Sequence, residues 1–339
     1  MLLEQRAVTP STGPDFICIP SDHRSYQRGE QQRVSLCHVS ITSSVDTLAG
    51  GHRIAADPRV MGMRFRVSHV TTYTYSQPVR LGAHWLRLRP RCDGAAELLQ
   101  FGLEIHPPPA GRSDSLDVEG NLASCVWFMG ETSRLIVASR FEVRTHRADP
   151  YDFLIEPAPW DELYAPVLQH RLVPWIAQDE VAPPVFALVR ELRDESKDAF
   201  EFVHRLNERL HRQIHREIRD TGPAHAPEET LRRGCGACRD LAVLFVAACR
   251  SQGLAARFVS GYQTSRGEHP RRYMHAWPEV YLPGAGWRGF DPTHGLAVAD
   301  RHVALAAAAR PEDAAPVDGT YRGDAHSVLK TDVRIDVDE

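Results

Sequence analysis

Three residue types that together can perform nucleophilic catalysis occur in order in the second half of the chain. Cys238 lies in the run GCGACRD, directly before apolar residues that recur every three or four positions, the spacing of a helix with one buried face. At a helix N-terminus, free backbone N–H groups and the helix dipole lower the pKa of a thiol. His275 and Asp291 follow in the runs MHAW and GFDPT. This order indicates a nucleophile, a general base and a residue that orients the base.

The sequence around these residues resembles the bacterial transglutaminase-like superfamily. The matching runs are GACRDLAVLFVAACRSQGLAARFVSGY and MHAWPEVYLPGAGWRGFDPTHG, and the resemblance covers roughly residues 63 to 335. It implies a fold similar to that of papain, with Cys238 as the nucleophile, His275 as the base and Asp291 as the third member of a triad. It also implies an ATP-grasp-type ligase as a possible partner in peptide-tag processing.

The fold class that we expect is α+β. An antiparallel β-sandwich should come first, because apolar and polar residues alternate with period two around Phe65, Leu86 and Phe141. A papain-like or transglutaminase-like core should follow, in which the helix that carries Cys238 packs on an antiparallel sheet that carries the histidine and the aspartate.

Four segments are expected along the chain. Residues 1–62 lack periodicity, and we expect them to be disordered or a misassigned extension ahead of the true start. Residues 63–147 form the β-rich N-terminal domain. Residues 148–183 are rich in proline and aromatic residues, which predicts a connector without a long helix. Residues 184–335 form the catalytic domain, which ends in a closing strand.

Composition and charge argue against several classes of protein. The 339 residues carry a net charge of −4, which gives no electrostatic basis for binding nucleic acid. No apolar run is long enough to span a membrane, and no run resembles a calcium-binding loop. The seven cysteines are scattered, and the N-terminus lacks a secretory pattern, so we expect a reducing, cytoplasmic compartment and no cofactor.

Cys235 and Cys238 form a C-x-x-C pair, a spacing that dithiol redox centres and zinc sites also use. The remaining cysteines supply no second pair for zinc. A redox centre would leave His275 and Asp291 without a role, so it is the weaker alternative. A separate hypothesis is that the two thiols form a reversible disulfide that switches the enzyme off.

Three further histidines lie near the expected site. His215 and His225 precede the nucleophile but have no cysteine or carboxylate at ligand spacing, so we interpret them as surface residues and not as metal ligands. His294 follows the Asp-Pro-Thr run, where the resembled family usually carries asparagine. It is either neutral in effect or a competitor for Asp291.

The spacing of base and acid does not by itself bring them together. Folding the predicted hairpin symmetrically about the turn at 283–286 sets Asp291 opposite Pro278, which is three residues, or about 10 Å, from His275. A bulge at the proline could close part of the gap. The pairing of His275 with Asp291 therefore depends on the resemblance.

The function that we expect is acyl transfer on peptide or protein amides through a thioester on Cys238. The oxyanion would be met by the backbone N–H of Cys238. Water as the acceptor would make the protein a protease or amidase, and an amine would make it a transglutaminase; the sequence leaves both open. The alternative is a non-catalytic peptide-binding or scaffold protein that retains the fold.

Overall fold

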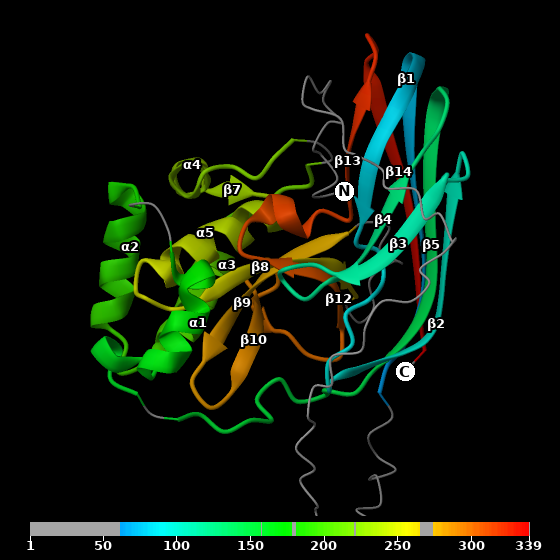
Figure 1. The fold of residues 1–339 in the computed structure, drawn as a ribbon. Helices are drawn as coiled ribbons and strands as arrows, with labels where there is room; N and C mark the ends of the chain where they lie inside the picture. The colour runs from blue at the N-terminus through cyan, green and yellow to red at the C-terminus, as the bar shows by residue number, and fades with distance from the viewer. Residues whose placement is uncertain (1–61, 157, 178–180, 220–221, 265–273, 339) are drawn as a thin grey trace, which may run out of the picture. The chain divides into compact units, whose positions relative to one another are not determined.

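The computed structural model describes residues 62–156, 158–177, 181–219, 222–264 and 274–338 of the chain. The prediction for residues 1–61 lies outside these ranges. Within them, strands dominate the N-terminal region, and helices packed on a second sheet follow, as the predicted fold class requires (Figure 1). No helix in these ranges is long and apolar enough to cross a bilayer.

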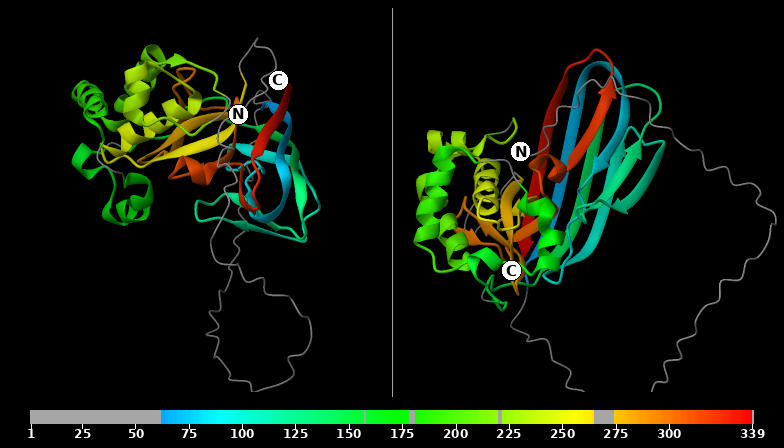
Figure 2. Two further views of the ribbon diagram at one scale, coloured as in Figure 1. Left: turned by 90° about the horizontal axis from the view of Figure 1, so that it is seen from above. Right: turned by 60° about the vertical axis from the view of Figure 1, so that its left-hand side comes forward.

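The N-terminal region forms around β1 (Arg64–Leu86), a 23-residue strand that folds over near its middle (Figure 2). Pairing along β1 breaks between Thr74 and Val79, in an exposed stretch that includes Pro78, a residue without an N–H to donate. The first half pairs with β5 (Thr132–Thr145), which pairs in turn with β2 (Ala96–His106). The second half pairs with β4 (Leu122–Trp127), which pairs with β3 (Gly111–Leu116). The result is the predicted antiparallel, two-layered arrangement.

The last two strands of the chain complete these layers. β13 (Val317–Arg322) pairs with the second half of β1, and β14 (Ser327–Asp338) pairs with the first half, from Arg64↔Asp338 to Tyr75↔Ser327. The closing strand exists as predicted, but it joins the N-terminal region instead of the sheet of the catalytic core. Alternation of apolar and polar residues identifies a strand and its buried face, and it does not identify the sheet that the strand joins.

The core sheet has five antiparallel strands in the order β11-β10-β9-β8-β12. Their bounds are β8 (Ala256–Gln263), β9 (His275–Leu282), β10 (Gly286–Asp291), β11 (Leu296–Ala297) and β12 (His302–Ala308). Helix α5 (Cys238–Arg250) packs against β8 and β9 (Figure 1). The sequence thus places the helix with the cysteine on the strand that begins with the histidine.

Three further helices pack around α5. They are α2 (Pro183–Asp194), α3 (Ala199–Gln213) and the short α4 (Pro227–Arg233), with the two-residue strands β6 (His215–Arg216) and β7 (Cys235–Gly236) beside α4. α2 and α3 bury their apolar faces with the inner face of α5 in one cluster, which gives the nucleophile helix a rigid support.

The segment predicted as a connector without a long helix contains α1 (Pro166–Ile176) in addition to a short 3-10 turn, η1 (Trp160–Glu162). Pro166 occupies the first turn, where its missing N–H costs nothing. Pro174 lies within one turn of the helix end, so few hydrogen bonds are lost. The proline content therefore sets the limits of this helix and does not prevent it.

One buried cluster joins the N-terminal layers to the core. Tyr262 of β8 contacts Phe141 of β5 at a ring separation of 5.8 Å, and its hydroxyl lies 2.6 Å from Nδ1 of His69 on β1. The same cluster includes Cys238 and Ala242 of α5. Because the two regions share apolar packing next to the nucleophile, the N-terminal layers support the site directly.

Gly261 on β8 is a position where the fold requires the smallest residue. A Cβ atom there would lie 2.2 Å from the carbonyl oxygen of Val303 and 2.7 Å from the Trp277 ring. We expect Gly261→Ala to lower the free energy of unfolding by about 1–3 kcal/mol, measured by urea denaturation, since backbone cannot move aside cheaply. Gly94→Ala, whose Cβ would meet nothing within 4 Å, is the matched control and should change stability by less than about 0.5 kcal/mol. Equal effects of the two substitutions would contradict this packing.

Candidate active site

The predicted nucleophile occupies the first position of α5. Ala237 is the N-cap, and it has no side-chain oxygen that could compete for the first N–H groups of the helix. These N–H groups and the helix dipole therefore remain available to an anion next to the Cys238 sulfur. Cys238 retains 8 % of its surface exposed. Sequence reasoning placed this residue correctly at a helix start.

The start of α5 is fixed by Asp240, which is fully buried. Its Oδ2 accepts a hydrogen bond of 2.7 Å from the backbone N–H of Ala237. The guanidinium of Arg219 donates to both carboxylate oxygens at 2.9 Å, and the backbone N–H of His225 donates to Oδ1 at 2.8 Å. One carboxylate thus joins the preceding loop to the residue in front of Cys238.

His225 differs from its predicted status as a surface residue without a carboxylate partner. The chain brings Asp240 and Glu217 to it, with ligand atoms of the three residues within 4.8 Å of one another. Arg219, however, donates to the imidazole and the Asp240 carboxylate together, so a guanidinium already holds the position that a cation would take. His215 is exposed, as predicted.

The hairpin that carries the base and the acid has a different register from the predicted one. Gly286 pairs with Leu282, so the turn has three residues, and Gly284 and Gly286 supply the positive φ angles that it needs. Continued to its end, this register sets Asp291 opposite position 277 and not opposite Pro278. Position 277 is two residues from His275, and side chains two residues apart on a strand share a face. Asp291 therefore projects from the same face as His275.

His275 and Asp291 meet directly. Nε2 of His275 lies 2.8 Å from Oδ2 of Asp291, with both side chains almost wholly buried. The same imidazole also interacts with the Cys238 thiol, because the charge of His275 lowers the pKa of that thiol. The structure thus brings together all three residues of the predicted triad.

The electrostatics of the three residues favour an ion pair. Burial would raise the pKa of the Cys238 thiol, but the charge of His275 and hydrogen bonds from its imidazole and from the backbone of Ala276 outweigh burial and lower that pKa. Burial would lower the pKa of His275, yet the charges of Asp291 and Cys238 raise it to about 9. The directions of these two shifts favour a thiolate paired with an imidazolium.

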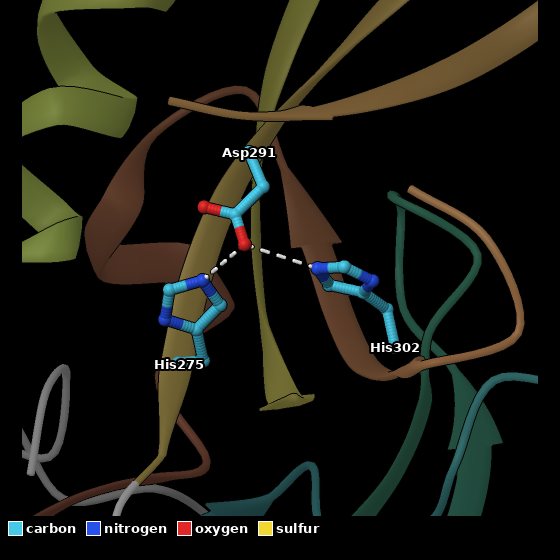
Figure 3. Close-up of side chains that lie close together, drawn as sticks. All are labelled: His275, Asp291 and His302. Atoms are coloured by element: carbon cyan, nitrogen blue, oxygen red, sulfur yellow. Dashed lines mark hydrogen bonds and ion pairs between the residues drawn. The ribbon is translucent and has the colours of Figure 1, made fainter. Parts of the chain in front are cut away.

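Asp291 holds two more imidazoles besides that of His275. Its Oδ2 lies 2.7 Å from Nδ1 of His294 and 3.1 Å from Nε2 of His302, and its Oδ1 accepts the backbone N–H of Thr293 at 3.1 Å. Figure 3 shows His275 and His302 approaching the carboxylate from opposite sides. Burial would raise the pKa of Asp291, but the charge of His275 and the hydrogen bonds from these rings hold that pKa well below its ordinary value.

His294 therefore hydrogen-bonds to the same carboxylate oxygen as His275, which agrees with the hypothesis that it competes for Asp291. Sequence reasoning missed His302, which lies at the start of β12 and pairs with Gln263 of β8. Only this long-range pairing brings it to Asp291. Burial lowers the pKa of His302 despite the opposing effect of Asp291, so the ring is neutral and donates from Nε2.

The three side chains drawn in Figure 3 also form a group that could hold a metal ion, with ligand atoms within 4.8 Å of one another. An ion there would have to displace the hydrogen bonds that join both imidazoles to Asp291. It would also take the His275 nitrogen that orients the base. The hydrogen-bonded arrangement accounts for these residues without a metal.

Selective alkylation tests the ionisation of the site. We expect iodoacetamide to modify Cys238 at a rate that changes less than about threefold between pH 9 and pH 7, because the thiolate persists there. Cys92 is more exposed, but burial raises the pKa of its thiol, so its rate should fall about tenfold per pH unit. Mass spectrometry of the two tryptic peptides measures both rates. A parallel fall for the two cysteines would contradict the ion pair.

Comparisons with known proteins agree with this architecture. A model of the transglutaminase-like superfamily matches residues 187–292, and a model of the bacterial transglutaminase-like N-terminal region matches residues 65–144. An uncharacterized protein of Mycobacterium tuberculosis is 29% identical over 291 residues, which cover 81% of this chain and 92% of the relative. An uncharacterized protein of Mycobacterium leprae is 25% identical over 293 residues, covering 80% and 98%.

A solved structure shares the fold. The crystal structure of a candidate cysteine protease from Cytophaga hutchinsonii superposes with a TM-score of 0.64 at 18% identity, and covers 82% of this chain and 91% of that chain. With two matching family models in the order that the structure shows, this chain is a bacterial transglutaminase-like superfamily protein, with a transglutaminase-like core behind a β-rich N-terminal region.

Proposed function

We propose that the protein is a cysteine-dependent acyl-transfer enzyme that acts on amides of peptides or proteins. The observation that carries this proposal is the buried imidazole of His275, which is hydrogen-bonded to Asp291 and whose charge lowers the pKa of the Cys238 thiol. The transglutaminase-like core supports a cysteine-based chemistry.

In the first step the Cys238 thiolate attacks the amide carbonyl carbon. A C–S bond forms, and the carbonyl oxygen becomes an oxyanion next to the first N–H groups of α5. As the tetrahedral intermediate collapses, the C–N bond breaks, and His275 gives its proton to the departing amine. The product is a thioester on Cys238 with a neutral His275.

In the second step water or an amine attacks the thioester carbonyl. His275 accepts the proton of the attacking group, a C–O or C–N bond forms, and the C–S bond breaks. Cys238 leaves as the thiolate, which restores the original ion pair. Asp291 keeps the imidazole in the required tautomer throughout and balances its charge. The choice of acceptor separates a protease or amidase from a transglutaminase.

The two alternatives make different demands on the site. A peptide-binding scaffold has no use for a thiol with a lowered pKa, and a dithiol redox centre has no use for an imidazole fixed by a buried carboxylate. The regulatory disulfide between Cys235 and Cys238 is compatible with acyl transfer and remains a separate hypothesis.

Replacement of the nucleophile tests the proposal. A peptide library, incubated with and without an amine acceptor, should be turned over by the wild type, and Cys238→Ala should reduce turnover at least about a thousandfold, since the covalent step is lost. Mass spectrometry identifies hydrolysed or amine-linked products. Cys235→Ser is the matched control and should retain turnover under reducing conditions. Equal turnover by wild type and Cys238→Ala would exclude this mechanism.

Replacement of the acid tests the role of its charge. In Asp291→Asn the amide oxygen still accepts from His275, as in cysteine proteases that use asparagine, but the charge that raises the pKa of His275 is gone. We expect kcat/KM to fall about 10–100-fold and the basic limb of its pH profile to move to lower pH, because the imidazolium deprotonates earlier. Asp313→Asn, at a surface ion pair with Arg310, is the control. An unshifted basic limb would remove Asp291 from this role.

A further inference from the structure

A cavity of about 450 Å³ lies beyond the triad, between the N-terminal layers and the core sheet. His302 and Trp277 form part of its wall, and Ala95 and Gly120 lie on the N-terminal side. Figure 3 shows one nitrogen of His302 facing Asp291 and the other pointing away from the carboxylate. The cavity is thus one imidazole away from the acid of the proposed triad, and its size suits a small ligand.

Two buried polar atoms of this wall have no hydrogen-bond partner among the described residues. They are Nδ1 of His302 and Nε1 of Trp277, on side chains that are almost wholly buried. The indole nitrogen lies beside Gly289, which also lines the cavity, because a Cβ on that glycine would be 3.2 Å from it. A buried polar atom without a partner is destabilising, so this wall is suited to a polar occupant.

The two unpartnered atoms require opposite chemistry from that occupant. Trp277 can only donate, so it needs an acceptor. His302 is neutral and donates from Nε2 to Asp291, so its Nδ1 presents a lone pair and needs a donor.

The cavity also holds an excess of positive charge. Arg91, Arg147 and Arg257 line it, against the carboxylates of Asp93 and Glu279. Glu279 is taken by Arg257, at 2.6 Å. Among the residues that the structure describes, Arg147 has neither a hydrogen bond nor an ion pair. Its guanidinium is therefore available to an anionic ligand.

We propose that this cavity binds a small organic carboxylate that also carries a hydroxyl or ammonium group. The carboxylate meets Arg147 and accepts from Nε1 of Trp277, and the hydroxyl or ammonium group donates to Nδ1 of His302. The ligand thus contacts His302, and His302 is hydrogen-bonded to Asp291. The cavity is therefore a second binding site that adjoins the triad. The inference concerns binding and does not depend on the acyl-transfer proposal.

Calorimetry with two matched probes tests the site. Malate carries the hydroxyl that succinate lacks, and both carry the carboxylates. We expect malate to bind the full-length protein with a Kd below about 1 mM, and succinate to bind at least about fivefold more weakly, because it leaves Nδ1 of His302 without a partner. Equal affinities would overturn the assignment of the donor to His302. No saturable heat with malate up to about 10 mM would show that the cavity holds water only.

Substitution of the unpaired arginine locates the binding. Arg147→Gln should weaken malate binding at least about tenfold, because one charge-assisted contact is lost. The rate of Cys238 alkylation in the absence of malate should not change. Arg140→Gln, on the exposed face of β5 beside Glu104, is the control and should bind malate as the wild type does. Malate binding that survives Arg147→Gln unchanged would place the ligand elsewhere and overturn the proposal. Because neither measurement uses turnover, its failure is distinct from a failure of the proposed function.

Discussion

The buried carboxylate of Asp291 is the constraint on which the site depends. A charged group with no exposed surface persists only when its oxygens are saturated with donors, and here three imidazoles and a backbone N–H supply them. These donors come from β9, from the turn after β10 and from the start of β12. The same bonds that stabilise the charge therefore fix the relative positions of three segments of the chain and orient His275.

A second buried carboxylate, that of Asp240, positions the thiol. Asp240 joins the N-cap of α5 to Arg219 and to the loop before the helix, so the backbone around Cys238 is held from both directions. The nucleophile and the base thus sit on two separately anchored elements, and the contact of α5 with β9 sets their separation. Positioning by rigid elements on both sides keeps the ion pair formed before any substrate arrives.

Local patterns could identify much of this arrangement. We could predict the helix start at Cys238 and the chain order of His275 and Asp291 from the sequence, because each depends on nearby residues. The predicted hairpin register was wrong by one position. Composition does not distinguish a three-residue turn from a four-residue turn when several residues permit either. His302 could not be found at all, because it reaches Asp291 only through the pairing of β12 with β8. The sheet joined by the last strand was missed for the same reason.

The ultraviolet absorbance of the thiolate, titrated against pH for the wild type and for Cys238→Ala, tests the central claim most directly. The account predicts that the difference between the two proteins already shows a full thiolate signal at pH 7, because the imidazolium beside Cys238 lowers the pKa of the thiol. A signal that emerges only above about pH 8.5, the ordinary range of a cysteine, would contradict the ion pair and the mechanism that follows from it.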